Sequence, residues 1–227
     1  VAGEPNSIFL EIFFKSTKKL NIKHPLILIA SIRLIKLQMK KLKIKEKINE
    51  KNFENLFKQQ LKSNCLNVLN VNYDTKVAFE NNSAKSNKYV ENCFKEAFKI
   101  LKTKKINKLI NGPIIKKTFL KKKYLGLTEY VSKKFNIDDS AMLIYNKNIA
   151  VCPLTTHMPL KYVAKNINKK NIFKKIKLID NFYKTMFHKK PRIAILGLNP
   201  HCESIDKFNE DEKILIPTVK FLVNKKF

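Results

Sequence analysis

Hydrophobic positions along the chain follow two spacings, which predict helices separated by short strands. In several stretches apolar residues recur every three or four positions, a period typical of a helix with one buried face. These stretches are residues 7–17, 86–105, 128–135, 168–187 and, with an interruption around Pro217, 206–223. Short apolar runs are typical of buried strands, and they occupy residues 25–30, 66–71, 108–110, 148–154 and 192–198.

The order of these elements predicts an α/β fold. Strand 25–30 is followed by Ser31, a residue type that favours the start of a helix, so this part is a β-then-α unit. Strands that alternate with helices tend to pair in parallel and to be covered on both faces. Residues 141–145 and 148–154 flank a tight turn at 146–147, which predicts an antiparallel portion.

Two polar stretches interrupt this pattern. Residues 43–62 are highly charged, and we expect an exposed or irregular arm there. Residues 72–85 are expected to form a loop. A chain of 227 residues is long enough for one large domain or two modest ones.

The charge of the chain narrows the class of partners. The chain has 47 basic residues and a net charge of +29, which raises the question of nucleic-acid binding. Only Arg33 and Arg192 are arginines, whereas recognition of bases and phosphates favours the bidentate guanidinium. The lysines are scattered, so the charge indicates a solvated surface that attracts small anions, with no specific nucleic-acid partner.

No segment is expected to cross a membrane, because the apolar run 25–32 is far shorter than the roughly 20 residues that a span needs. The first residues lack the basic and apolar regions of an export signal, so we expect a cytoplasmic protein. Its four separated cysteines form no CxxC pair and are expected to be reduced thiols. The chain begins with Val1 instead of Met, which indicates that it is cut.

Two histidines follow predicted strands and are the first candidates for chemistry. His157 lies in Thr-Thr-His-Met-Pro-Leu after strand 148–154, and His201 lies in Asn-Pro-His after strand 192–198. Ligands collect at strand ends in open α/β sheets, and imidazole suits zinc and other first-row metals. The pair indicates a divalent metal site, which normally takes three protein ligands. On spacing alone, two hydrogen-bonded polar residues at loop starts explain the pattern equally well.

A nucleotide site has weaker support. The chain has only four glycines and contains neither Gly-x-Gly-x-x-Gly nor a P-loop motif. The turn at residues 111–116 has Gly112 and Lys116, which could meet a phosphate, but an ordinary turn with a surface lysine is the simpler explanation. His24, before a strand, and His188, in a basic run, are not naturally placed as a third metal ligand.

Five motifs occur in a fixed order along the chain. They are Gly-Glu-Pro at 3–5, Asn-Gly-Pro-Ile-x-Lys at 111–116, Gly-x-Thr-Glu-Tyr at 126–130, Thr-Thr-His-Met-Pro-Leu at 155–160 and Gly-Leu-Asn-Pro-His at 197–201. With these motifs the chain resembles the 4-hydroxythreonine-4-phosphate dehydrogenases of pyridoxal phosphate biosynthesis. The resemblance covers nearly the whole chain, and the two histidine motifs are its most specific parts.

The resemblance implies an α/β/α sandwich related to isocitrate and isopropylmalate dehydrogenases, and a homodimer with its site at the interface. It implies NAD and a divalent metal, such as zinc, magnesium or cobalt. The implied reaction oxidises 4-phosphooxy-L-threonine to a ketone, which then loses its carboxylate to give 3-amino-2-oxopropyl phosphate. By the same resemblance His157 and His201 are metal ligands, and Thr128 and Lys116 contact the substrate.

The chain also departs from the family pattern. Leu127 stands where the family has a substrate-contacting histidine, and residues 7–11 lack two glycines of the family pattern. The third metal-binding histidine of the family belongs to a motif that does not occur before Phe227. We therefore expect a chain that is truncated at both ends and lacks a complete active site.

The expected domain organisation follows from this. Residues 1–227 should form one incomplete α/β/α enzyme unit, with a subdivision into 1–115 and 116–227. Three alternatives stay open for the function. Leu127 is compatible with a dehydrogenase of another phosphorylated hydroxy acid, such as threonate or erythronate phosphate. The other two are a lysine-rich polyanion-binding protein without catalysis, and a degenerate chain without activity.

Overall fold

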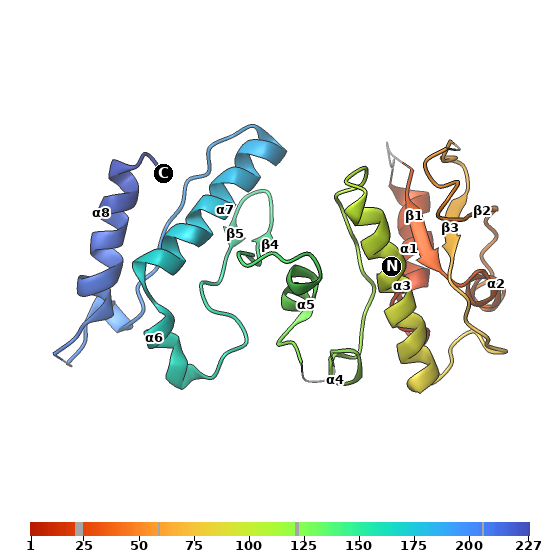
Figure 1. Cartoon of the computed structure of the whole chain (residues 1–227), viewed down its shortest axis with the longest axis horizontal. Helices are drawn as coiled ribbons and strands as arrows, with labels where there is room; N and C mark the ends of the chain where they lie inside the picture. Colours follow the sequence, from red (N-terminus) through yellow and green to blue (C-terminus); the bar gives the residue numbers. More distant parts are fainter. Residues whose placement is uncertain (21–24, 59, 121–122, 206) are drawn as a thin grey trace. The chain divides into compact units, whose positions relative to one another are not determined.

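The computed structural model describes residues 1–227 except residues 21–24, 59, 121–122 and 206. The chain divides into unit 1, Val1–Lys123, and unit 2, Tyr124–Phe227, and each is described by itself. Unit 1 runs from red to green in Figure 1, and unit 2 from green to blue. Within the described ranges, no helix is both long and apolar enough to span a membrane.

Unit 1 is built around a parallel sheet with strand order β1-β3-β2. β1 (Ile27–Ala30) and β3 (Leu66–Asn70) confirm the two predicted strands, and most of their residues are buried. β2 (Ile48–Lys51) pairs with β3, so the prediction of an irregular arm at 43–62 was wrong for this part. The strand was missed because its sequence, Ile-Asn-Glu-Lys, is polar, as is common for a strand at a sheet edge.

The helices of unit 1 are α1 (Phe9–Lys19), α2 (Ile32–Lys41), α3 (Ala84–Lys102) and the short α4 (Lys116–Phe119). Ser31 Oγ accepts a hydrogen bond of 3.3 Å from Leu34 N, which confirms the predicted start of α2. α3 begins earlier than predicted because Ser83 and Ser86 form a reciprocal capping box. Local hydrogen bonds therefore decide where these helices begin.

The core of unit 1 joins the helices to the sheet. Phe14 of α1, Leu28 of β1, Ile35 of α2 and Val68 of β3 lie in one buried cluster. Burial of each such side chain stabilises the fold by about 1.5–3 kcal/mol. These elements are therefore held together mainly by apolar packing.

The first residues of the chain extend this sheet region. The main chain of residues 1–4 pairs with β1 on one side and with residues 110–113 on the other, through hydrogen bonds of 2.8–3.2 Å. The described residues 108–110 belong to no strand, so that prediction was wrong, although Ile110 O accepts one of these bonds from the Val1 amino group.

Unit 2 contains a hairpin and several helices. β4 (Ile144–Tyr145) and β5 (Ala150–Val151) pair antiparallel around the 146–147 turn, so the hairpin is confirmed, although its strands are short. α5 (Leu127–Lys134) and α7 (Lys169–Phe187) match their predicted ranges within one residue. The shorter pieces are η1 (Leu160–Tyr162), α6 (Val163–Asn166) and η2 (Pro200–Cys202).

The last helical region changes its geometry close to the predicted proline. η3 (Asp211–Leu215) is a π-helical turn that continues directly into α8 (Ile216–Asn224). Pro217 is the second residue of α8, directly after the π-helical turn, so the helix changes its hydrogen-bonding pattern where the proline lacks an N–H. This confirms the predicted change around Pro217, although Asp206, where the prediction began, lies outside the described residues.

The prediction of a strand at residues 192–198 was wrong, since the described residues there belong to no strand. Ile195 and Leu198 instead pack on a core cluster that includes Ile172 of α7 and Leu222 of α8. An apolar run in the sequence indicates only that the segment is partly buried. A strand also needs a neighbouring backbone to pair with, and none among the described residues pairs with this segment.

Candidate active site

His157 lies in the loop of residues 155–160, which we call the His157 loop. β5 ends at Val151, so the histidine is a loop residue some way beyond the strand. Its side chain is exposed, and its φ of +55° lies in the left-handed region that few residues other than glycine adopt. The local backbone conformation is therefore a specific feature of this loop.

The imidazole of His157 faces the start of α5. A Cβ atom on Gly126 would lie 3.3 Å from Nε2 of His157 and 2.7 Å from Oε2 of Glu129. Thr156 Oγ1 donates a hydrogen bond of 3.5 Å to the other oxygen, Oε1 of Glu129. Oε2 is buried and has no hydrogen-bond partner among the described residues. Gly126 thus leaves room for a carboxylate and an imidazole beside each other.

His201 lies in the loop of residues 197–202, which we call the His201 loop. Its side chain is exposed, and its φ is +56°, almost the same as that of His157. Cys202 follows with a φ of +59°. The two candidate ligands therefore share an unusual backbone conformation.

Asp211 of η3 holds the His201 loop. Its Oδ1 accepts a hydrogen bond from Leu198 N at 2.9 Å, and its Oδ2 accepts bonds from Asn199 N at 3.0 Å and Asn199 Nδ2 at 3.1 Å. A Cβ atom on Gly197 would lie 3.0 Å from Oδ1 and 2.6 Å from Cys202 Sγ. Burial raises the pKa of Asp211, but the hydrogen bonds together lower it by a larger amount. The pKa therefore lies below its usual 3.8.

The donor chemistry fits part of a metal site. Two imidazoles are suitable ligands for a divalent metal, but no group of three His, Cys, Asp or Glu residues that could hold one occurs in the described part of the chain. His188 ends α7 with a φ of +53°, so it has a structural place there. His24 lies outside the described residues. The metal roles of His157 and His201 therefore stay predictions.

The two predicted substrate residues are both exposed. Lys116 is the first residue of α4 in unit 1, and Thr128 is the second residue of α5 in unit 2. Leu127, in the place of the family histidine, is half-buried at the first position of α5. The substrate contacts of Lys116 and Thr128 stay predictions.

Glu4 secures the turn before Lys116. Its carboxylate is buried, and Oε1 accepts a hydrogen bond of 3.3 Å from Ile115 N. Burial raises the pKa of Glu4, and the bond from Ile115 opposes this only in part. A Cβ atom on Gly3 would lie 2.4 Å from Pro113 O, and one on Gly112 would lie 2.3 Å from Ala2 O. The backbones of the Gly-Glu-Pro and Asn-Gly-Pro motifs therefore cross so closely that each segment needs its glycine.

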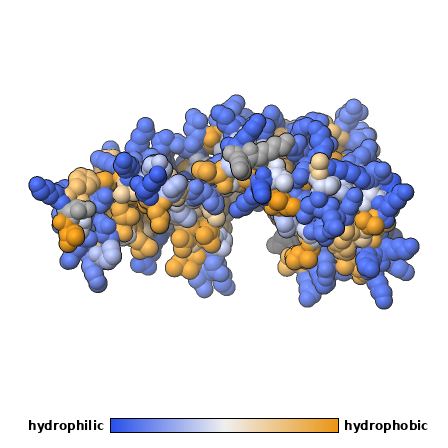
Figure 2. Space-filling view, turned by 90° about the horizontal axis from the view of Figure 1, so that it is seen from below, coloured by the Kyte–Doolittle hydropathy of each residue, from blue (hydrophilic) through white to orange (hydrophobic). Residues whose placement is uncertain are grey.

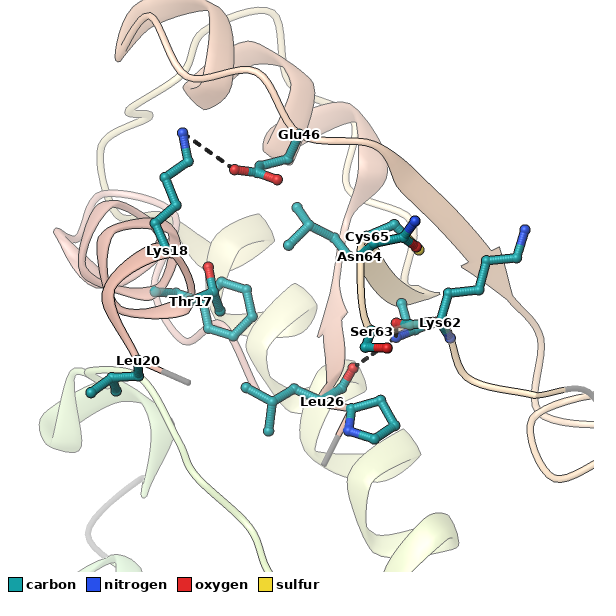
Figure 3. Close-up of a pocket in the computed structure, with 13 residues that line it drawn as sticks. Thr17, Lys18, Leu20, Leu26, Glu46, Lys62, Ser63, Asn64 and Cys65 are labelled. Carbon is teal, nitrogen blue, oxygen red and sulfur yellow. Dashed lines mark hydrogen bonds and ion pairs between the residues drawn. The ribbon is translucent and has the colours of Figure 1, made fainter. Parts of the chain in front are cut away.

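A cavity of about 370 Å³ opens in unit 1 near the amino ends of β1 and β3. Figure 3 shows Lys18 and Glu46 above it, joined by an ion pair of 3.4 Å, with Ser63, Asn64 and Cys65 on the opposite wall. None of the predicted site residues lines it. Ligands in open α/β sheets collect at the carboxyl ends of strands, so this cavity is not the predicted site.

Comparison with known proteins decides the family. Residues 17–227 match the family described as pyridoxal phosphate biosynthetic protein PdxA. The chain belongs to this family. The match includes Lys116, Thr128 and both histidine loops, and the resemblance seen in the motifs is confirmed. The relatives described below are named as dehydrogenases, which agrees with the predicted enzyme class.

The relatives also show how much of the family is represented. A 4-hydroxythreonine-4-phosphate dehydrogenase from Sulfurihydrogenibium sp. is 37% identical over 158 residues, which cover 66% of this chain and 48% of the relative. A D-threonate 4-phosphate dehydrogenase from Pectobacterium atrosepticum is 29% identical over 136 residues, which cover 59% and 42%. The chain spans about half the length of the curated relatives that it matches.

Solved structures confirm the predicted fold class. The 4-hydroxythreonine-4-phosphate dehydrogenase of Klebsiella pneumoniae has a TM-score of 0.78 at 21% identity, and the match covers 99% of this chain and 71% of that one. At this identity the likeness concerns the fold alone. It supports the α/β architecture, with a mostly parallel sheet and an antiparallel portion.

Two carboxylates were not anticipated from the sequence. Glu129 lies in the Gly-x-Thr-Glu-Tyr motif, but nothing in that motif indicates contact with Thr156, 27 residues later. Asp211 binds main-chain groups 12 and 13 residues before it and stands between Glu210 and Glu212. No local pattern distinguishes it from its acidic neighbours.

Proposed function

We propose that the protein oxidises 4-phosphooxy-L-threonine with NAD in a metal-assisted reaction, and that the product loses CO₂ to give 3-amino-2-oxopropyl phosphate. The observation that carries the proposal is the pair of histidine loops in a PdxA chain. Each loop presents an exposed histidine with left-handed backbone and packs against a carboxylate beside a glycine. The Sulfurihydrogenibium relative, which carries the corresponding name, supports the choice of substrate.

The protein's own residues have separate tasks in this proposal. His157 and His201 bind a divalent metal through unprotonated nitrogens, together with a third ligand from outside the described residues. When bound, the metal supplies stabilisation of negative charge on the substrate oxygen, and NAD supplies the hydride acceptor. The Thr128 hydroxyl hydrogen-bonds the substrate, and the Lys116 ammonium binds an anionic group of it.

A second substrate has specific support. The Pectobacterium relative is named for D-threonate 4-phosphate, and Leu127 removes a polar contact that the family histidine would provide. Parallel assays of NAD reduction with 4-phosphooxy-L-threonine and D-threonate 4-phosphate separate the two. A higher kcat/KM for the amino acid supports the main proposal, and the reverse order supports the alternative.

We include a homodimer in the proposal. Ile144, Ile149 and Val151 of the hairpin region are 57%, 73% and 53% exposed, which is unusual for large apolar side chains so close in sequence. Figure 2 shows one face of the molecule, where orange apolar side chains interrupt a mostly blue surface. Light scattering of the protein and of Ile149→Lys tests this, because a charge in a subunit interface would lower the molar mass.

The central test is enzymatic. The purified protein should form NADH from NAD when 4-phosphooxy-L-threonine and a divalent metal are both present, and chelation should stop the reaction. His157→Ala should abolish the activity, whereas His188→Ala, which changes another exposed histidine, should retain it. Activity that is unaffected by chelation and by His157→Ala would contradict the proposal.

A further inference from the structure

Glu129 has one carboxylate oxygen that accepts a hydrogen bond and one that lacks a donor among the described residues. Oε1 accepts the hydrogen bond from Thr156, the residue directly before His157. Oε2 is buried without a partner in the part of the chain that the structure describes. A buried acceptor without a donor costs free energy, and native proteins rarely leave one so.

The geometry identifies a candidate donor for this oxygen. Oε2 of Glu129 and Nε2 of His157 lie 2.7 and 3.3 Å from the same point, the place of a Cβ on Gly126. Gly126 itself is buried, so this point is shielded from bulk solvent. An imidazole N–H in this position can reach the buried carboxylate oxygen after a rotation of the His157 side chain.

We infer that Glu129 is a positioning residue for His157: it accepts a hydrogen bond from Nε2–H and so presents Nδ1 to a metal ion. The metal ion in this inference comes from the proposed function, whereas the contact between Glu129 and His157 does not depend on it. A histidine that ligates a metal commonly donates its second N–H to a carboxylate, which fixes the ring orientation and raises ligand basicity. Gly126 takes part because any side chain there would separate the two groups.

The first experiment measures Zn²⁺ affinity by calorimetry in a double-mutant cycle. Glu129→Ala should weaken binding about 10–100-fold, the usual loss for a residue that supports a metal ligand. Combined with His157→Ala it should cause no additional loss, because Glu129 acts through that imidazole. Glu212→Ala removes an exposed carboxylate in η3 and should leave the affinity unchanged. Unchanged affinity in Glu129→Ala, or losses that simply add, would overturn the inference.

The second experiment needs no metal and no substrate. In the metal-free protein the Nε2–H proton of His157 should be observable by NMR, since a hydrogen bond to a carboxylate slows its exchange with water. The signal should disappear in Glu129→Ala and persist in Glu129→Asp, which keeps the carboxylate. Its absence from the unaltered protein would refute the contact. An observed signal in a protein without dehydrogenase activity would leave the inference standing while the proposed function fails.

Discussion

The two histidine loops are each paired with a glycine and a carboxylate, but the two carboxylates differ in the hydrogen bonds that they accept. At both loops a glycine leaves space for a carboxylate, Gly126 at the start of α5 beside His157 and Gly197 within the His201 loop, and each histidine has a φ near +55°. Asp211 accepts hydrogen bonds of 2.9–3.1 Å from the main chain and side chain of the His201 loop. Glu129 accepts a single bond of 3.5 Å and keeps Oε2 unpaired among the described residues.

From this difference we expect a structural role for Asp211 and a role beside the candidate metal ligand for Glu129. A carboxylate that accepts several hydrogen bonds stabilises its loop, and little of its bonding capacity is left for a ligand. A carboxylate with an unpaired buried oxygen is less stabilising and available for a further donor. We therefore expect changes at Asp211 to affect mainly folding, and changes at Glu129 to affect mainly the chemistry of His157.

The largest effect should come from the histidines themselves. His157→Ala and His201→Ala should each weaken Zn²⁺ binding by more than about 100-fold, since loss of a ligand costs more than loss of its support. Calorimetric titration measures this, with His188→Ala as the control. If only one histidine matters, the two loops are not equivalent halves of one metal site.

The next effect concerns the stability of the His201 loop. Asp211→Ala removes the acceptor of three partly buried hydrogen bonds, two of them from main-chain donors of the loop, and should lower the free energy of unfolding by about 3 kcal/mol. Glu129→Ala should lower it by no more than about 1 kcal/mol, because it removes one long hydrogen bond. Urea denaturation measures both, with Glu212→Ala as the matched acidic control. Equal losses at Asp211 and Glu129 would contradict the distinction.

The glycines should show the same contrast on a smaller scale. An alanine Cβ at Gly197 would collide with Cys202 Sγ and with Asp211, which its hydrogen bonds hold in place, so Gly197→Ala should cost about 1–3 kcal/mol of stability. At Gly126 the first collision is with the end of the Glu129 side chain, which can rotate away. Gly126→Ala should therefore change stability little and weaken Zn²⁺ binding instead. Thermal unfolding and calorimetry of both variants provide the comparison.

The smallest effect is a dependence of stability on pH. The pKa of Asp211 is lowered on folding, so the unfolded chain takes up the proton first as the pH falls. The stabilisation is therefore complete above about pH 4 and is lost as the pH falls through the lower pKa of the folded protein. The difference in unfolding free energy between the protein and Asp211→Asn should shrink below pH 4. A difference that is constant from pH 7 to pH 3 would refute this.

The sequence by itself determined the elements whose signals are local. The β-then-α unit at 25–41, the amphipathic helices α3 and α7 and the hairpin follow from apolar periodicity, capping residues and turn residues. The motifs also identified the family and the two candidate histidines before any geometry was considered. These features depend on neighbours within a few positions, which the sequence displays directly.

Only the tertiary structure decided which groups meet. The polar strand β2 exists because β3 offers it a partner, and the apolar run at 192–198 forms no strand because no described backbone segment pairs with it. The pairings of Glu129 with Thr156 and of Asp211 with the His201 loop join residues far apart in the chain. No local pattern distinguishes one carboxylate from another, because its role depends on which donors the fold brings to its oxygens.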